Sequence, residues 1–319
     1  MLADSVQSHE GPDRWGVLLL AHGAPDKLED IPEFLLNVCG GRPLPAPVVE
    51  EITHRYAQIG GGSPLLHHTR GQAEALAARL NRPVYVGMRN WRPFIADTVK
   101  EISRDGVKRL VVLCLAPQNS RTSVGLYRSY LANALEQTAS FMAVAFVESW
   151  HDQPQFIRAL AEKLCIALDR AQAAAGTEVP VILTAHSVPE KTIAAGDPYE
   201  LQVRQTMARV VAAAGCAHWQ AAFQSQGMTA EPWIGPSVES VIDQLAEAGH
   251  RHVLIAPVGF VADHVEVLYD IDIAFRGYAG QKGLTLWRTE SLNDSPLLIE
   301  ALAAVAEEQI RLATGSRRP

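Results

Sequence analysis

The chain has 319 residues, of which 48% are hydrophobic and 20% are charged, and its formal net charge is −7. This length and composition are typical of a folded globular protein with room for two domains. The acidic balance excludes a domain-wide basic field and so argues against nucleic acid as the partner, and no run of about 18 apolar residues is present to span a membrane.

Four scattered cysteines form no C-x-x-C pair, so the sequence offers no zinc or iron–sulfur spacing. Nothing indicates disulfides, and the first 14 residues lack the apolar core of a signal peptide. We therefore expect a protein of the reducing cytoplasm.

Along the first half of the chain, short apolar runs predict buried strands at residues 15–21, 84–88, 110–116 and 142–147. Helical spacing or composition predicts helices at residues 31–38, 48–59, 69–80, 94–105 and 123–137. Three glycines at 60–62 precede Ser63 and Pro64 and predict a loop that can approach a ligand closely. No G-x-G-x-x-G or Walker motif opens a βα unit, so nucleotide binding is not expected.

The second half repeats the alternation, with strands predicted at residues 181–185, 221–224, 252–257 and 284–289. Helices are predicted at residues 154–175, 199–214, 237–248, 262–274 and 295–312. The pattern predicts an α/β fold of two similar Rossmann-like halves, each a parallel sheet flanked by helices. We expect residues 14–148 and the closing helix 295–312 to form one half, and residues 149–294 to form the other.

An internal repeat supports the two halves. Residues 17–27 read VLLLAHGAPDK and residues 181–191 read VILTAHSVPEK, with six identical places that include His22 and His186. Both histidines follow apolar runs, and ligands of open α/β sheets bind outside the carboxyl ends of the strands. We therefore expect both imidazoles to face a cleft between the halves, although a histidine at a strand end can also be purely structural.

A third candidate lies in FVADHVEVLYDID, residues 260–272, which follows another strand end. In a helix, Glu266 and Asp270 would share a face. They are either part of a solvated acidic face or, because apolar residues flank Glu266, a partly enclosed pair. An enclosed carboxylate can have a raised pKa and exchange protons near neutrality. The two histidines and Glu266 lack the spacing of a closed metal cage but would suit an open site.

Six distinctive phrases are spread along the chain: IGGGSPL, VGMRNWRPFI, LAPQNSRTSVGLY, AHSVPEK with GDPY, AFQSQG with PWIGPSV, and PVGFVADHVEVLYDID. Together they resemble the ferrochelatase family, over nearly the whole chain from Trp15 to the C-terminal helix. The resemblance implies two Rossmann-like halves around a porphyrin cleft and insertion of ferrous iron without an organic cofactor. It places the family's catalytic histidine at His186 and its catalytic carboxylate at Glu266, with His186, Glu266 and His22 as the residues expected to meet the metal.

Some positions depart from the family pattern. Relatives often have tyrosine at the place of His22, on the opposite side of the macrocycle from the catalytic histidine, so iron contact there could differ. Iron–sulfur members carry cysteines near the C-terminus, whereas this chain has none after Cys216. We therefore predict that no iron–sulfur cluster is bound.

Two features favour coproporphyrin III over protoporphyrin IX as the porphyrin. The segment of residues 25–60 is short and contains charged residues, whereas protoporphyrin enzymes often carry a longer apolar insertion at this place. The phrase PVGFVADHVEVLYDID is more similar to that of coproporphyrin-type enzymes. Four propionates would require cationic and hydroxyl anchors. The resemblance implies a porphyrin-binding set that otherwise would be ordinary surface or packing residues: His22, Arg55, Ser63, Tyr127 and Ser225.

Other functions remain open at this level: a protoporphyrin IX ferrochelatase, a cobalt or nickel tetrapyrrole chelatase, or a haem-binding carrier without catalysis. Retention of both His186 and Glu266 argues against the carrier. We expect a monomer whose partners are the porphyrin, Fe²⁺ and, transiently, neighbouring haem-pathway enzymes.

Overall fold

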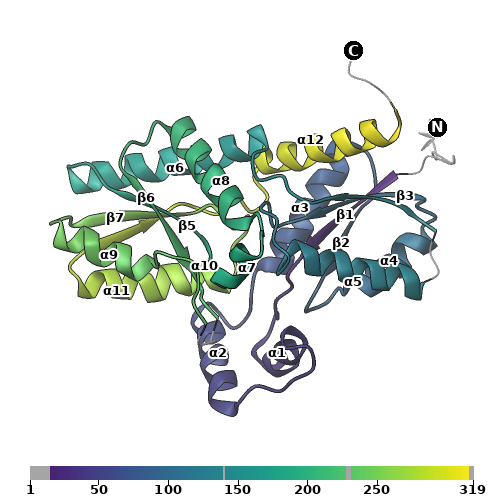
Figure 1. Cartoon of the computed structure of the whole chain (residues 1–319), viewed down its shortest axis with the longest axis horizontal. Coiled ribbons are helices and arrows are strands. Elements are labelled where there is room, and N and C mark those ends of the chain that lie inside the picture. Colours follow the sequence, from purple (N-terminus) through teal and green to yellow (C-terminus); the bar gives the residue numbers. More distant parts are fainter. Residues whose placement is uncertain (1–14, 139–140, 228–230, 316–319) are drawn as a thin grey trace, which may run out of the picture.

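The computed structural model of the chain describes residues 15–138, 141–227 and 231–315 (Figure 1). Two four-stranded sheets lie side by side, and every strand pair within them is parallel. The first sheet contains β1 (Trp15–Ala21), β2 (Val84–Met88), β3 (Arg109–Cys114) and β4 (Ala143–Val147). The second contains β5 (Val181–His186), β6 (Trp219–Gln224), β7 (His252–Pro257) and β8 (Thr285–Arg288).

The two sheets share one topology, with strand orders β2-β1-β3-β4 and β6-β5-β7-β8. The repeated phrase of the sequence lies on β1 and β5, which hold the same place in the two sheets. Both strands are almost entirely buried, as expected for parallel strands covered on both faces by helices. The predicted α/β fold of two similar halves is confirmed.

The helices in the described part of the first half are a short 3₁₀ turn (Leu28–Asp30), α1 (Ile31–Val38), α2 (Ala46–Gln58), α3 (Leu65–Leu80), α4 (Ile95–Arg104) and α5 (Val124–Gln137). Those that follow are α6 (Pro154–Ala175), α7 (Glu190–Ala194), α8 (Tyr199–Ala214), α9 (Val238–Glu247), α10 (Val265–Leu268), a π-helix (Asp270–Phe275), α11 (Arg276–Gln281) and α12 (Pro296–Ala313). Within the described ranges, no helix combines the length and the apolar character that crossing a membrane requires.

Helix α12 joins the two halves. It packs against α3, β3 and β4 of the first half and against α6 of the second. Its buried face, which includes Leu298, Leu302 and Ala306, belongs to a core cluster that also contains β1 and β5 residues. The two sheets are therefore held beside each other by one continuous apolar core.

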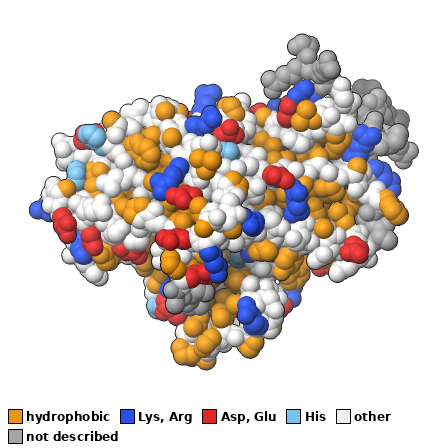
Figure 2. All heavy atoms as spheres, in the orientation of Figure 1, with side chains coloured by type: hydrophobic (Ala, Val, Ile, Leu, Met, Phe, Trp, Pro, Cys, Tyr) orange, Lys and Arg blue, Asp and Glu red, His pale blue; other side chains and the backbone are white. Residues whose placement is uncertain are grey.

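Helices α1 and α2 form a lobe that projects from the sheets (Figure 1). Hydrophobic side chains gather on this lobe in the space-filling view (Figure 2). Leu36 and Val38 of α1 are among the exposed hydrophobic residues of the chain. Elsewhere on the same face, acidic and basic side chains are interspersed (Figure 2).

The predicted single helix over residues 262–274 is wrong in form. The helical backbone begins only at Val265, stops after four residues as α10, and continues as a π-helix from Asp270. Asp263 stays outside the helix because its carboxylate accepts hydrogen bonds from Ser291 and Asn293, in the segment after β8. Tertiary contacts have overridden the helical periodicity of this segment.

Candidate active site

His186 ends β5 with its ring oriented by the neighbouring backbone. Its Nδ1 donates to the carbonyl oxygen of Ser187, and the Tyr199 hydroxyl donates to the carbonyl oxygen of His186 itself at 2.8 Å. Because a carbonyl can only accept, the Nδ1 hydrogen bond leaves Nε2 as the nitrogen that can take up a proton or a metal. That Nε2 lies 3.7 Å from Oε1 of Glu266.

Glu266 reaches the same place from α10. Its two carboxylate oxygens face two histidines, with Oε2 lying 3.7 Å from Nε2 of His264. Burial alone would raise the pKa of Glu266, but His186, His264 and His22 together lower it to about 2. The expectation of a raised pKa at Glu266 is therefore wrong, because its histidine neighbours outweigh its burial. The side chain is still 32% exposed, so solvent reaches it.

His264 is a member of this site that the sequence reasoning missed. Its ring packs edge-on against Phe260, and its Nδ1 hydrogen-bonds the carbonyl oxygen of Ala262 at 2.9 Å. Burial would lower its pKa, but the Glu266 carboxylate raises it above its ordinary value. Residues two apart do not face each other on a helix, so the helical interpretation hid this pair. Extended backbone at His264, with φ −162°, turns its ring toward Glu266.

His22 follows β1, and its two ring nitrogens are both engaged. Nδ1 contacts the carbonyl oxygen of Gly23 at 2.9 Å, and Nε2 lies 3.0 Å from the side-chain amide nitrogen of Asn90. The consistent arrangement has Nδ1 donating and Nε2 accepting from the amide. Burial, helped by Arg89, lowers the pKa of His22 to about 4, so the ring is neutral at pH 7. The nitrogen expected to meet iron is thus occupied by Asn90.

Asp270 follows α10 and is the carboxyl group of the site that titrates near neutrality. Burial and the Glu266 charge raise its pKa to about 6, against the opposing effect of Ser225 and Arg55. The Ser225 hydroxyl donates to Asp270 at 2.6 Å from a backbone with φ +59°, which is uncommon outside glycine. The predicted residue Ser225 is therefore present in the site, but its hydroxyl is bound to Asp270.

Two other predicted anchors, Arg55 and Tyr127, lie close to this group of residues. Arg55 pairs with Glu51 at 3.0 Å and places its guanidinium over the ring of Tyr269 at 5.2 Å, which brings α2 against the Glu266 segment. Tyr127 is buried, lies 5.4 Å below the Arg89 guanidinium, and has its pKa raised by burial and by Glu266. These contacts place Arg55 and Tyr127 beside the histidine–carboxylate group.

Ser63 makes hydrogen bonds to nearby backbone groups and has none with the histidines or carboxylates of the site among the described residues. Its hydroxyl accepts from the amide of Leu65, and its own amide donates to the carbonyl oxygen of Pro25 at 2.9 Å. A Cβ at Gly62 would lie 2.1 Å from the carbonyl oxygen of Asp26, so the glycine there permits close packing on the exit loop of β1. In this structure the glycine-rich loop supports the loop that carries His22.

The site is open toward metal. Across residues 15–138, 141–227 and 231–315, no group of three or more His, Cys, Asp or Glu side chains has the arrangement of a metal cage. His186 and Glu266 are 37% and 32% exposed, so they present donor atoms that an ion could reach and leave. Such an arrangement suits a metal that passes through the site.

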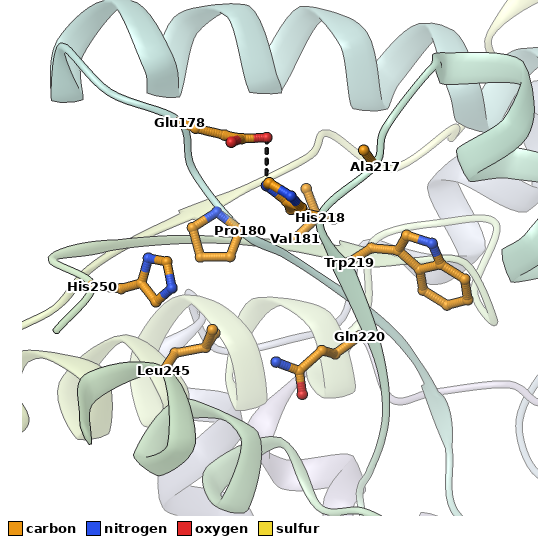
Figure 3. A pocket seen from close by; sticks show the side chains of 9 residues that line it. All are labelled: Glu178, Pro180, Val181, Ala217, His218, Trp219, Gln220, Leu245 and His250. Carbon is orange, nitrogen blue, oxygen red and sulfur yellow. Dashed lines mark ion pairs between the residues drawn. The ribbon is translucent and has the colours of Figure 1, made fainter. Parts of the chain in front are cut away.

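A separate pocket of about 410 Å³ lies at the opposite end of the second sheet (Figure 3). It is lined by the start of β5 at Val181, whereas His186 ends the same strand. Its polar side chains include His218, which pairs with Glu178 at 2.7 Å, and His250. The pocket is therefore separate from the histidine–carboxylate site.

Comparisons with known proteins give matches over nearly the whole chain. A family model described as Ferrochelatase matches residues 14–310. A "Ferrochelatase" of Acidobacterium capsulatum is 47% identical over 322 residues, covering 96% of this chain and 98% of the relative. A "Coproporphyrin III ferrochelatase" of Geobacillus thermodenitrificans is 37% identical, covering 92% and 96%. Among solved structures, the sirohydrochlorin chelatase SirB of Bacillus subtilis with cobalt covers 95% of this chain and 97% of its own, with a TM-score of 0.60 at 10% identity, which is a likeness of fold alone.

Proposed function

The chain belongs to the ferrochelatase family, which inserts iron into a porphyrin in haem biosynthesis, and from that premise we propose that its porphyrin is coproporphyrin III. The observation that carries the catalytic assignment is the pair of His186 Nε2 and Glu266 Oε1, 3.7 Å apart and open to solvent. This pair lies at the end of β5, where this fold class binds ligands.

Metal insertion replaces two pyrrole N–H protons with one Fe²⁺. We propose that Nε2 of His186 accepts one of these protons, since the other ring nitrogen is bound to the Ser187 carbonyl oxygen. Tyr199 holds the backbone of His186 through its carbonyl oxygen. Glu266, with its low pKa, stays ionised and stabilises the imidazolium that forms and the arriving cation. Asp270, with a pKa of about 6, is better suited than Glu266 to receive a proton and release it to solvent.

The preference for coproporphyrin III is supported by relatives and by charge. Relatives named for coproporphyrin III are 34–38% identical over at least 91% of the chain, although the 47% identical relative is named only for ferrochelatase. Arg89 adds a physical argument, because its half-buried guanidinium has no carboxylate partner among the described residues. We propose that Arg89 and the Tyr127 hydroxyl bind one propionate of the porphyrin. We propose that Arg55 leaves its ion pair with Glu51 and binds a second propionate.

Rates of iron insertion into coproporphyrin III and protoporphyrin IX, measured side by side, test this proposal. We expect kcat/KM to favour coproporphyrin III by at least about tenfold, because a site built to pair charged groups discriminates against an analogue that lacks them. Arg89→Met should raise KM for coproporphyrin III more than for protoporphyrin IX. Arg92→Met is the matched control, since Arg92 lies in the same loop but pairs with Glu33 at 2.9 Å. A preference for protoporphyrin IX would overturn the assignment.

We further propose a monomeric cytoplasmic enzyme that uses neither an organic cofactor nor an iron–sulfur cluster and contacts neighbouring haem-pathway enzymes only transiently. The four cysteines are free and dispersed, which supports a reducing compartment. Sedimentation of the purified protein, with iron and sulfide analysis of the same sample, tests the oligomeric state and the cluster together.

A further inference from the structure

The segment that carries Glu266 has little local structure of its own. Helix α10 is only four residues long, its N-cap residue His264 makes no side-chain cap, and a π-helix follows it directly. So short a helix is not stable by itself, and π-helical turns are rare and less favourable than α-helical ones. The position of Glu266 must therefore be set by contacts with other parts of the fold.

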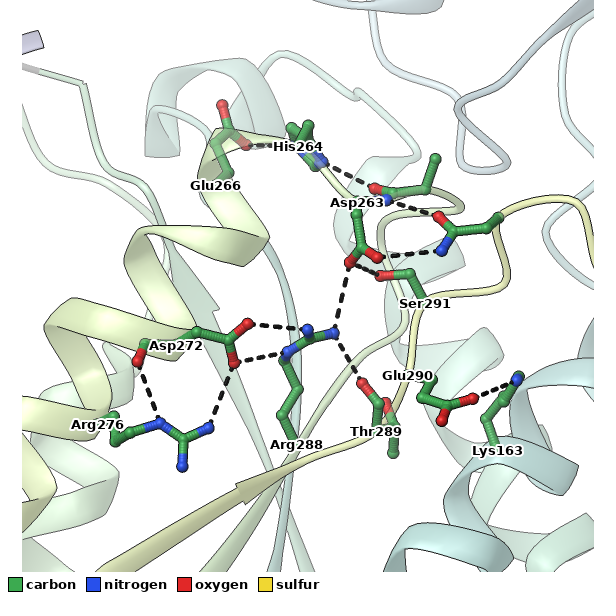
Figure 4. Close-up of polar contacts among 12 residues, drawn as sticks. Lys163, Asp263, His264, Glu266, Asp272, Arg276, Arg288, Thr289, Glu290 and Ser291 are labelled. Atoms are coloured by element: carbon green, nitrogen blue, oxygen red, sulfur yellow. Dashed lines mark hydrogen bonds and ion pairs between the residues drawn. The ribbon is translucent and has the colours of Figure 1, made fainter. Parts of the chain in front are cut away.

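One contact is direct: the buried Gln224 side chain at the end of β6 donates to the carbonyl oxygen of Glu266 at 2.7 Å. Arg288, the last residue of β8, contacts the segment at two other points (Figure 4). Its Nε and Nη2 bond the two oxygens of Asp272 in the π-helix, each at 2.8 Å. Its Nη1 donates to the carbonyl oxygen of Thr289 at 2.9 Å and lies 3.5 Å from Oδ1 of Asp263. Only 15% of the side chain is exposed, and a planar guanidinium paired through two parallel bonds is geometrically specific.

The two carboxylates that Arg288 joins lie on either side of the catalytic segment. Asp263 immediately precedes His264 and is itself held by Ser291 at 2.7 Å and Asn293 at 3.0 Å. Asp272 lies beyond Glu266 in the π-helix, which starts at Asp270. Figure 4 shows Arg288 between these carboxylates, with His264 and Glu266 on the part of the segment that is farther from the guanidinium.

We propose that Arg288 is a positioning residue for iron insertion: by tying Asp263 to Asp272 across the segment, it sets the placement of His264 and Glu266 relative to His186. This inference rests on the proposed role of Glu266. Arg288 has no direct contact with His186, His264 or Glu266 among the described residues, so it acts through the backbone that carries them. A small displacement of Glu266 would lengthen its 3.7 Å approach to His186 and weaken the charge stabilisation there.

Arg288→Lys tests the proposal, because lysine keeps the charge but cannot bond both oxygens of Asp272 while reaching Asp263. We expect kcat to fall about tenfold or more, since a displacement of about 1 Å in a catalytic group can cost about a hundredfold in rate. The KM for the porphyrin should stay near the wild-type value, because the porphyrin anchors are not disturbed. Fluorescence quenching on porphyrin binding gives an independent measure of affinity.

Arg276→Met is the matched control. Arg276 also contacts Asp272, at 3.4 Å through Nη2, but it is half exposed and does not bridge to Asp263. It should lower the melting temperature without lowering kcat. Asp272→Asn is a second variant, which keeps the shape of the side chain and should show the same loss of kcat. It provides the test if Arg288→Lys does not fold.

A wild-type kcat in Arg288→Lys or in Asp272→Asn, or an equal kcat loss in Arg276→Met, would overturn the proposal. All variants are assayed with whichever porphyrin the wild-type protein converts faster, so a wrong choice of porphyrin would leave this comparison intact. If Glu266 has no catalytic role, kcat will be unchanged in Glu266→Gln, and this result is independent of the Arg288 variants.

Discussion

His22 and His186 stand at the exits of β1 and β5, the two strands that hold the same place in two sheets of one topology. Their surroundings differ. Nε2 of His22 accepts from the Asn90 amide, whereas Nε2 of His186 faces the Glu266 carboxylate at 3.7 Å. The repeated phrase thus places two imidazoles alike, and the loops that face them decide which one can take up a proton. Burial keeps the first ring neutral while the Asn90 amide occupies its Nε2, and a carboxylate faces Nε2 of the second ring.

The largest expected effect that distinguishes the two exits is that of His186→Ala. Loss of the proton acceptor should lower kcat about a hundredfold to ten-thousandfold, the range that general acid–base groups contribute. His22→Ala should lower kcat far less, because its ring is neutral and already hydrogen-bonded. Initial rates of iron insertion, with circular dichroism to confirm folding, measure both. Equal losses in the two variants would show that the exits are functionally equivalent.

Glu266→Gln sharpens the comparison by making the His186 exit resemble the His22 exit, with an amide facing the ring. We expect kcat to fall about tenfold to a hundredfold, because the stabilising charge is lost while the shape is kept. Porphyrin affinity, measured by fluorescence quenching, should change little. If affinity collapses and kcat is unchanged, Glu266 anchors the porphyrin and does not act in the chemistry.

The pH dependence of Asp270 provides a third test. Its pKa is raised from 3.8 to about 6, so burial favours the protonated form, and the associated stability is present below pH 3.8 and lost as pH rises through about 6. Asp270→Asn should therefore raise the melting temperature relative to wild type more at pH 8 than at pH 4. If Asp270 accepts a proton during turnover, kcat of the wild type should also rise with pH through about 6, and this rise should be absent in the variant. A pH-independent difference in melting temperature would show that the Asp270 carboxyl is not perturbed.

The smallest expected effect concerns the His22 exit. Asn90→Ala removes the amide that occupies Nε2, so the freed nitrogen should approach the iron of the product and shift its visible spectrum while most activity is kept. His22→Tyr should shift the spectrum toward that of a phenolate-bound haem. Identical product spectra for the wild type, His22→Tyr, His22→Ala and Asn90→Ala would assign His22 a structural role at the strand end.

Much of the fold was predictable from local patterns. Buried parallel strands have short apolar sequences. The bounds of β1, β2 and β7 were therefore predicted without error and those of β4 and β5 within one residue, and the repeat indicated two similar sheets. The helix ends were less predictable: α3 begins at Leu65, four residues earlier than its composition indicated, and α7 was not expected. Helix ends depend on caps and on packing, which composition does not encode.

The sequence by itself determined where the candidate site residues lie along the chain, because His22 and His186 end apolar strands and Glu266 follows a third. Only the tertiary structure decided what those groups can do. The low pKa of Glu266 comes from His186 at the end of β5, from His264 two residues away, and last from His22. The broken helix around Glu266 follows from Arg288 and Asn293 at the end of the second sheet. Charge interactions depend on distance in space, so neither the sign of a pKa shift nor the partner that fixes a side chain can be read from spacing along the chain.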